Sequence, residues 1–216
     1  PRANSATQFI ISKHFDIFTN PNRLTPYRSF EADTNDGSTS TGMKQYYIKD
    51  FLYASASAKL YGLGQTGAGL TKILYKADAT TGNWTLPASS EGNGAVQNGC
   101  LVEFKDYLWG FQGTNQIFKW GLLSGTPSIT NSVATVGATI TSVANGIIAS
   151  DANLYLAYNN VLVRIAPGLT VTDSAKTVPT NYKITSLANY GNYLAIGCAP
   201  ISSFNGTSKV FIWNLS

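Results

Sequence analysis

Histidine occurs once in this chain, at His14, and that scarcity limits the chemistry available to it. A Ser-His-Asp triad would have to use this residue, and the G-x-S-x-G pattern that presents a nucleophilic serine does not occur. Cysteine is nearly as rare, because Cys100 and Cys198 are the only two. No Cys/His spacing suits a zinc site. We expect His14 to be a structural or docking residue, and the two cysteines to be buried free thiols in apolar strands instead of a disulfide.

Charge is also scarce. Asp, Glu, Lys and Arg make up 12% of the residues, whereas a typical soluble domain has about 25%. The net charge is +4, and the basic residues are scattered without a run that could follow a phosphate backbone. The longest apolar stretch, residues 133–150, is interrupted by Thr, Ser, Asn and Gly, so it does not resemble a span of about 20 apolar residues. We expect neither a nucleic-acid partner nor a membrane span.

An internal repeat organises the chain. "ITSVAN" (140–145) recurs as "ITSLAN" (184–189), 44 residues later. A second apolar block follows as "LYGLG" (60–64), "LWGFQ" (108–112), "LYLAY" (154–158) and "LAIGC" (194–198). A third block is "KILYKAD" (72–78), "QIFKWGL" (116–122), "VLVRIAP" (161–167) and "KVFIWNL" (209–215). A more polar fourth block closes three units: "NWTLPAS" (83–89), "PSITNSVATV" (127–136) and "GLTVTDSAKTV" (168–178).

Each unit therefore predicts four strands within about 45 residues, which is typical of an all-β chain folded as a β-propeller. A β-sandwich is the alternative, but near-identical segments at a fixed period argue against it. The expected blades are 46–95, 96–138, 139–183 and 184–216. The last blade lacks its fourth strand, for which three explanations are open: a longer ring, closure by the N-terminal segment, or completion by a second chain. Because four blades is the small limit for propellers, we favour a fragment of a larger ring.

Candidate catalytic acids do not form a recognisable pattern. Asp106 and Asp151 occupy nearly matching places before the second strand, where the fourth unit has Asn192. Asp and Asn favour tight turns, so we interpret all three as turn residues and not as the lining of a channel. A cluster at Glu31, Asp33 and Asp36 fails the calcium-loop test, because the loop lacks its glycine at the sixth position and its glutamate at the twelfth. No metal site is expected.

Sugar binding is a further hypothesis, because lectin propellers stack sugar rings on repeated aromatic residues. Trp120 and Trp213 hold equivalent positions, three residues after Ile117 and Val210. Both lie in apolar third strands, so packing between blades is the expected role. The other two blades have Lys76 and Ile165 at this position, which weakens a repeated site.

Residues 1–45 precede the repeat and are expected to form an extended arm. The segment "KHFDIFTNPNRLTPYRSFEAD" (13–33) contains two prolines that favour an extended, turning path. Aromatic and arginine side chains are common anchors of protein interfaces. The predicted docking residues are His14, Phe15, Phe18, Arg23, Tyr27, Arg28 and Phe30. The alternative is that this segment is an irregular strand of the ring itself.

The segment "SKHFDIFTNPNRLTPYRSFEAD", followed by "KQYYIKDFLYASASAKLYGLG", resembles the start of propeller proteins encoded among the virion structural genes of tailed bacteriophages. The resemblance extends to about residue 78, and the later blades share only the short apolar segments that are general among propellers. It implies a virion component without a cofactor, and it includes no catalytic motif.

The resulting hypothesis is a non-enzymatic structural or attachment protein of a phage virion. Its partners would be other virion proteins or copies of itself, and the arm would dock to neighbouring subunits. A carbohydrate-binding propeller that contacts a host-surface glycan, at a cell surface or outside the cell, is the alternative. A propeller glycoside hydrolase is the weaker one.

Overall fold

The computed structural model describes residues 15–16, 25–26, 46–54, 57–76, 84–87, 91–95 and 100–216. The chain divides into two compact units, Pro1–Thr34 and Asn35–Ser216. In the first unit, β1 (Phe15–Asp16) and β2 (Thr25–Pro26) form a two-stranded antiparallel pair, with Phe15 opposite Pro26. The described residues of both units form strands and turns, without a helix.

The second unit consists of four antiparallel sheets, each made of strands that are consecutive in the chain. The first contains β3 (Tyr47–Ala54), β4 (Lys59–Gln65), β5 (Thr71–Lys76) and β6 (Trp84–Thr85). The second contains β7 (Val102–Phe104), β8 (Tyr107–Gln112), β9 (Gln116–Gly121) and β10 (Ser128–Thr135). The third contains β11 (Val143–Ile148), β12 (Leu154–Tyr158), β13 (Val161–Ile165) and β14 (Val171–Thr177). The last contains β15 (Tyr182–Tyr190), β16 (Tyr193–Pro200) and β17 (Lys209–Trp213).

Strand pairing confirms the alignment of the repeats. Trp120 lies opposite Leu108, Ile165 lies opposite Leu154, and Trp213 lies opposite Leu194. The same position in the first sheet pairs Leu60 with Lys76. The second strands of the second and third sheets, β8 and β12, are buried at nearly every position, as their continuous apolar sequence predicts. In the last sheet, β16 alternates between buried and less buried residues, and in the second sheet β10 alternates between exposed and partly buried residues.

The two copies of the repeated segment, "ITSVAN" and "ITSLAN", belong to strands to different extents. "ITSLAN" lies wholly within β15, which begins at Tyr182, before the unit boundary expected at residue 184. In "ITSVAN", by contrast, β11 begins only at Val143. The two preceding residues, Thr141 and Ser142, donate their backbone N–H groups to Oδ1 of Asn159 (2.9 and 3.2 Å). A side chain therefore satisfies donors in this segment that lie outside the strand ladder.

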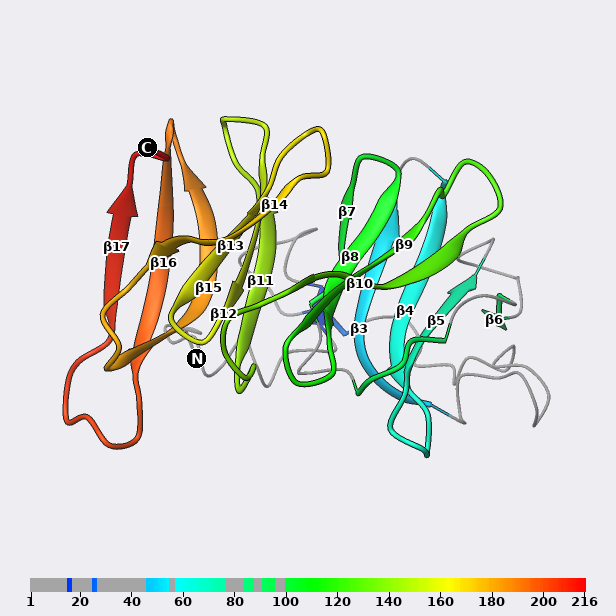
Figure 1. Cartoon of the computed structure of the whole chain (residues 1–216), viewed down its shortest axis with the longest axis horizontal. Coiled ribbons are helices and arrows are strands. Elements are labelled where there is room, and N and C mark those ends of the chain that lie inside the picture. Colours follow the sequence, from blue (N-terminus) through cyan, green and yellow to red (C-terminus); the bar gives the residue numbers. More distant parts are fainter. Residues whose placement is uncertain are drawn as a thin grey trace. The chain divides into compact units, whose positions relative to one another are not determined.

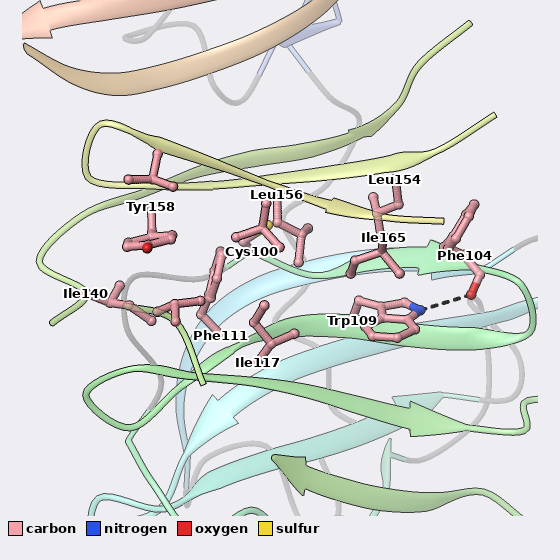
Figure 2. Packing of buried hydrophobic residues seen from close by; sticks show 13 residues of the cluster. Cys100, Phe104, Trp109, Phe111, Ile117, Ile140, Leu154, Leu156, Tyr158 and Ile165 are labelled. Carbon is pink, nitrogen blue, oxygen red and sulfur yellow. Dashed lines mark hydrogen bonds between the residues drawn. The ribbon is translucent and has the colours of Figure 1, made fainter. Parts of the chain in front are cut away.

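The core is divided into three apolar clusters, each between sheets that are consecutive in the chain. Leu108, Leu154 and Leu194, the equivalent residues of three second strands, are fully buried, each in a different cluster. Figure 2 shows the middle cluster, in which Trp109, Phe111 and Ile117 of the second sheet face Leu154 and Leu156 of the third. The sequence prediction that the three leucines are buried is confirmed.

The chain is therefore an all-β protein with a β-propeller fold of four-stranded antiparallel blades, as the repeat predicted. The sheets of the second unit follow one another in chain order (Figure 1). A two-sheet sandwich is excluded, because four sheets pack in succession. Among the described residues, no fourth strand pairs with β17, and β1 and β2 pair with each other.

Backbone hydrogen bonds at the turn between the second and third strands connect successive blades. In two blades, this turn accepts one bond from the residue that follows the outer strand and another from a residue just before or within the first strand of the next blade. The bonds, donor first, are Val136 to Asn115 (2.8 Å), Val178 to Asn160 (2.9 Å), Ile140 to Thr114 (2.7 Å) and Ile184 to Asn159 (2.6 Å). The repeat thus includes the links between blades as well as the strands.

Candidate functional site

Asp106 and Asp151 are turn residues, as their sequence positions predicted. Asp106 accepts hydrogen bonds from the backbone N–H (3.0 Å) and the hydroxyl of Ser124. Asp151 accepts from the hydroxyl of Tyr155 and the side-chain amide of Asn153, both at 2.7 Å. Burial alone would raise the pKa of Asp151, but these hydrogen bonds outweigh burial, and its pKa lies below the ordinary value. Both carboxylates therefore stabilise local structure.

Three other described carboxylates also form hydrogen bonds or an ion pair with other segments of the chain. Asp50 accepts from the backbone N–H of Leu101 (2.8 Å), which links the first sheet to the segment before the second. Asp173 accepts from Gly137 N–H (2.8 Å) and from the hydroxyl of Tyr158 (3.1 Å). Burial, together with the charge of Asp173, raises the pKa of Tyr158 to about 12.

The third is Glu91, which forms an ion pair with Lys72 (3.1 Å). Lys72 and Glu91 also face each other across an isolated backbone bridge. Within the described part of the chain, His, Cys, Asp and Glu do not gather in groups that could hold a metal ion. The acidic cluster at Glu31, Asp33 and Asp36 lies outside the described residues.

The two tryptophans considered for sugar stacking are buried, with exposed fractions of 0% for Trp120 and 6% for Trp213. Trp120 contacts the ring of Tyr61 and Trp213 contacts the ring of Tyr155, each with ring centroids 5.5 Å apart. These are edge-to-face contacts within the cores between sheets. The expected packing role is confirmed, and these two tryptophans are not available to a sugar.

Cys100 and Cys198 are free and buried, as expected. Burial raises the pKa of Cys100 to about 12 and also raises the pKa of Cys198 above its ordinary value. Both side chains are therefore protonated thiols near neutral pH, and they contribute to two of the apolar clusters.

A polar cavity of about 400 Å³ lies at the junction of the third and last sheets. It is lined by the turn Asn159–Asn160, by the segment before β11, by the start of β15 with the residue Thr180 before it, and by the segment after β16. The Asn159 amide is held by bonds from Thr141 and by its own bond to the carbonyl of Thr139 (2.7 Å). The residues that line the cavity are Thr141, Ser142, Asn159, Asn160, Thr180, Tyr182, Lys183, Ile201 and Ser202. Hydroxyl and amide groups, one lysine and one isoleucine thus line the cavity.

This cavity could not be predicted from the sequence. The only signal was the pair Asn159–Asn160, which predicts a turn and nothing about the segments that meet there. The exposure of large apolar residues in the first and last sheets, among them Phe51, Tyr53 and Val210, could not be predicted either. Their sequence is indistinguishable from that of buried strands.

Most of the predicted docking residues lie outside the described part of the chain: His14, Phe18, Arg23, Tyr27, Arg28 and Phe30. Phe15 is described only as a backbone position of β1. The docking role of all seven stays a prediction. No helix in the described ranges is long and apolar enough to cross a membrane.

No protein-family model and no curated protein matches the chain by sequence. Among solved structures, it is similar to a streptogramin B lyase and to the virginiamycin B lyase of Staphylococcus aureus. Each is 15% identical, with a TM-score of 0.49 over 90% of this chain. An alpha-L-arabinofuranosidase from Clostridium thermocellum is 13% identical, with a TM-score of 0.43 over 77% of this chain and 67% of that enzyme. The chain spans 59% and 60% of the length of the two lyases.

Proposed function

We propose that this protein is a non-enzymatic structural or attachment component of a tailed-phage virion. The propeller would be the rigid scaffold, and the N-terminal arm would dock to neighbouring subunits. The observation that carries the proposal is the structural use of five of the described carboxylates. Asp50, Glu91, Asp106, Asp151 and Asp173 each hold a turn, a strand or a neighbouring segment by hydrogen bonds or an ion pair.

This use of the acids argues against the glycoside hydrolase alternative. Glycoside hydrolysis needs two carboxyl groups on opposite sides of one glycosidic bond, and one of them must be available as a proton donor. Asp151 has a lowered pKa, the opposite of what a general acid requires. A virion component needs no such pair. The composition of the arm and its resemblance to the start of phage propeller proteins support the docking role.

The test is the simultaneous replacement of Phe15, Arg23, Tyr27 and Arg28 with alanine. We expect the variant to keep its β-sheet circular dichroism and to melt at nearly the wild-type temperature, but to fail to join particles or partner subunits. Interface anchors of these types each contribute about 2 kcal/mol or more, although not additively. Co-sedimentation with assembled particles is the measurement.

The control replaces four exposed polar residues of the blades, Ser128, Thr130, Ser132 and Thr135, with alanine. This variant should join particles as the wild type does. If the arm variant unfolds, the segment is an integral part of the fold and the docking role is withdrawn. If it folds and still assembles, docking uses another surface.

A second candidate function is binding of a host-surface glycan, and the cavity at Asn159–Asn160 favours it. Its hydroxyls and the Lys183 ammonium are groups that exchange hydrogen bonds with polyhydroxy ligands. On a glycan array, we expect any bound sugar to be lost with Lys183→Ala and retained with Lys49→Ala, a control that removes an exposed lysine from the first sheet. An array without binding, or binding that both variants retain, would exclude the cavity as a glycan site.

A further inference from the structure

The polar cavity at Asn159–Asn160 has charged groups of one sign beside it. Lys183 is the only charged residue among the described residues that line it. A second lysine lies next to its wall, because the Lys209 ammonium is 5.3 Å from the centre of the ring of Tyr182, a lining residue. Both lysines are exposed, and neither forms an ion pair with a described residue. The described lining thus has positive charge available to a ligand and contains no carboxylate.

Several hydroxyl groups of the lining form no hydrogen bond with any residue in the described part of the chain. They belong to Ser142, Thr180, Tyr182 and Ser202. Tyr182 is the most informative of them, because it is only 4% exposed and buried polar groups normally have a partner. The amides of Asn159 and Asn160 and the hydroxyl of Thr141, by contrast, are bonded within the chain. The unpaired hydroxyls can donate to and accept from the hydroxyls of a ligand.

The described lining offers no aromatic face on which a sugar ring could stack. The Tyr182 ring is buried, and it makes edge-to-face contacts with Phe204 (5.4 Å between centroids) and Phe211 (6.1 Å). Ile201 is the only aliphatic residue of the lining. Hydrogen bonds between neutral groups add little affinity, because they replace bonds to water, whereas those to an ionised group are roughly twice as strong. An anionic group on the ligand would therefore contribute most to binding here.

We propose that this cavity binds an acidic sugar, a ring that has a carboxylate or a sulfate beside its hydroxyls. The anionic group would pair with Lys183 and Lys209, and the ring hydroxyls would bond with the unpaired hydroxyls of the lining. The volume of about 400 Å³ lies within the range of about 300–1,000 Å³ that is usual for small-molecule sites. This inference rests on the glycan-binding candidate above and names the class of glycan.

A glycan array of matched pairs tests the class of ligand. Each uronic acid is printed beside the neutral hexose with the same ring hydroxyls, and sulfated galactose is printed beside galactose. We expect the acidic member of at least one pair to bind at least about 10-fold more tightly than its neutral partner. Binding should weaken when the salt concentration rises from about 0.1 M to 1 M, because salt screens exposed charges.

The outcomes separate this inference from the glycan function itself. If neutral sugars bind as tightly as acidic ones, or alone, the inference is wrong and the glycan function stands. An array without binding excludes both. Lys209→Ala should weaken binding of the acidic sugar by about 5-fold or more, and Lys209→Arg should restore most of it, because it keeps the charge. Lys49→Ala removes an exposed lysine of the first sheet and should have no effect. An equal loss with Lys49→Ala would mean that general positive charge, and not this cavity, attracts the sugar.

Tyr182→Phe tests the contribution of the hydroxyls separately from that of the charges. It keeps the ring contacts with Phe204 and Phe211 and removes only a hydroxyl that has no partner among the described residues. Thermal unfolding should therefore stay near that of the wild type. Affinity for the acidic sugar should fall by about 2–10-fold, while the preference for the acidic member of the pair should persist. If Tyr182→Phe or Lys209→Ala binds the acidic sugar as tightly as the wild type does, the sugar binds elsewhere and the assignment to this cavity is wrong.

Discussion

Replacing Trp109 with alanine is expected to lower the free energy of unfolding by about 3–5 kcal/mol, a large part of the about 5–15 kcal/mol of a typical domain. Trp109 is fully buried between the second and third sheets. Its indole N–H donates to the carbonyl of Phe104 at 3.1 Å (Figure 2). The substitution would leave a cavity and also remove the donor of a buried hydrogen bond. Chemical denaturation measures the change. The transition is followed by the circular dichroism of the β-sheets and not by tryptophan fluorescence.

Two further variants separate the contributions. Trp109→Phe retains most of the apolar volume and loses the indole N–H with a part of the ring system, so its cost should be well below that of Trp109→Ala. Tyr47→Ala removes an aromatic ring that is 67% exposed and should change stability by less than about 0.5 kcal/mol. If Trp109→Ala costs no more than Tyr47→Ala, the middle cluster does not hold the second and third sheets together.

Replacing Asn159 with alanine is expected to cost about 2–3 kcal/mol. Its Oδ1 accepts from Thr141 N–H (2.9 Å), the Thr141 hydroxyl (2.8 Å) and Ser142 N–H (3.2 Å). Its amide also donates to Thr139 O (2.7 Å). Each bond contributes roughly 0.5–1.5 kcal/mol, reduced here because the site is only partly buried. Asn159 also has a φ of 47°, a left-handed conformation that asparagine tolerates better than alanine. Thermal unfolding provides the measurement.

A glycine variant separates the effect of the lost hydrogen bonds from the effect of the left-handed backbone conformation. Asn159→Gly removes the same hydrogen bonds but relieves the backbone strain, so it should be less destabilising than alanine by about 1 kcal/mol. Asn160→Ala removes a side-chain bond to Val178 O (2.8 Å) and should cost about 0.5–1.5 kcal/mol. Equal effects of Asn159→Ala and Asn160→Ala would show that Asn159 does not tie the third blade to the segment before β11.

The local features of the blades could be predicted from the sequence alone. The apolar blocks gave the second and third strands, and their spacing gave the equivalence of Trp120, Ile165 and Trp213 that strand pairing confirms. The turn role of Asp106 and Asp151 was also predictable. These features depend on residues within one repeat, where side-chain alternation and turn preferences act. The docking role of the arm was inferred from composition and stays a prediction.

Burial and long-range contacts were decided only by the tertiary structure. Val210 and Ile117 occupy the same position in similar apolar strands, yet one is 66% exposed and the other is fully buried. The difference is the presence of a following sheet, which no residue of the strand itself encodes. From the sequence, Asn159 is an ordinary turn residue, but its amide binds a segment about 20 residues earlier, and the residue lines a cavity. A local pattern determines which side of a strand is apolar, whereas the packing of distant segments determines what covers it.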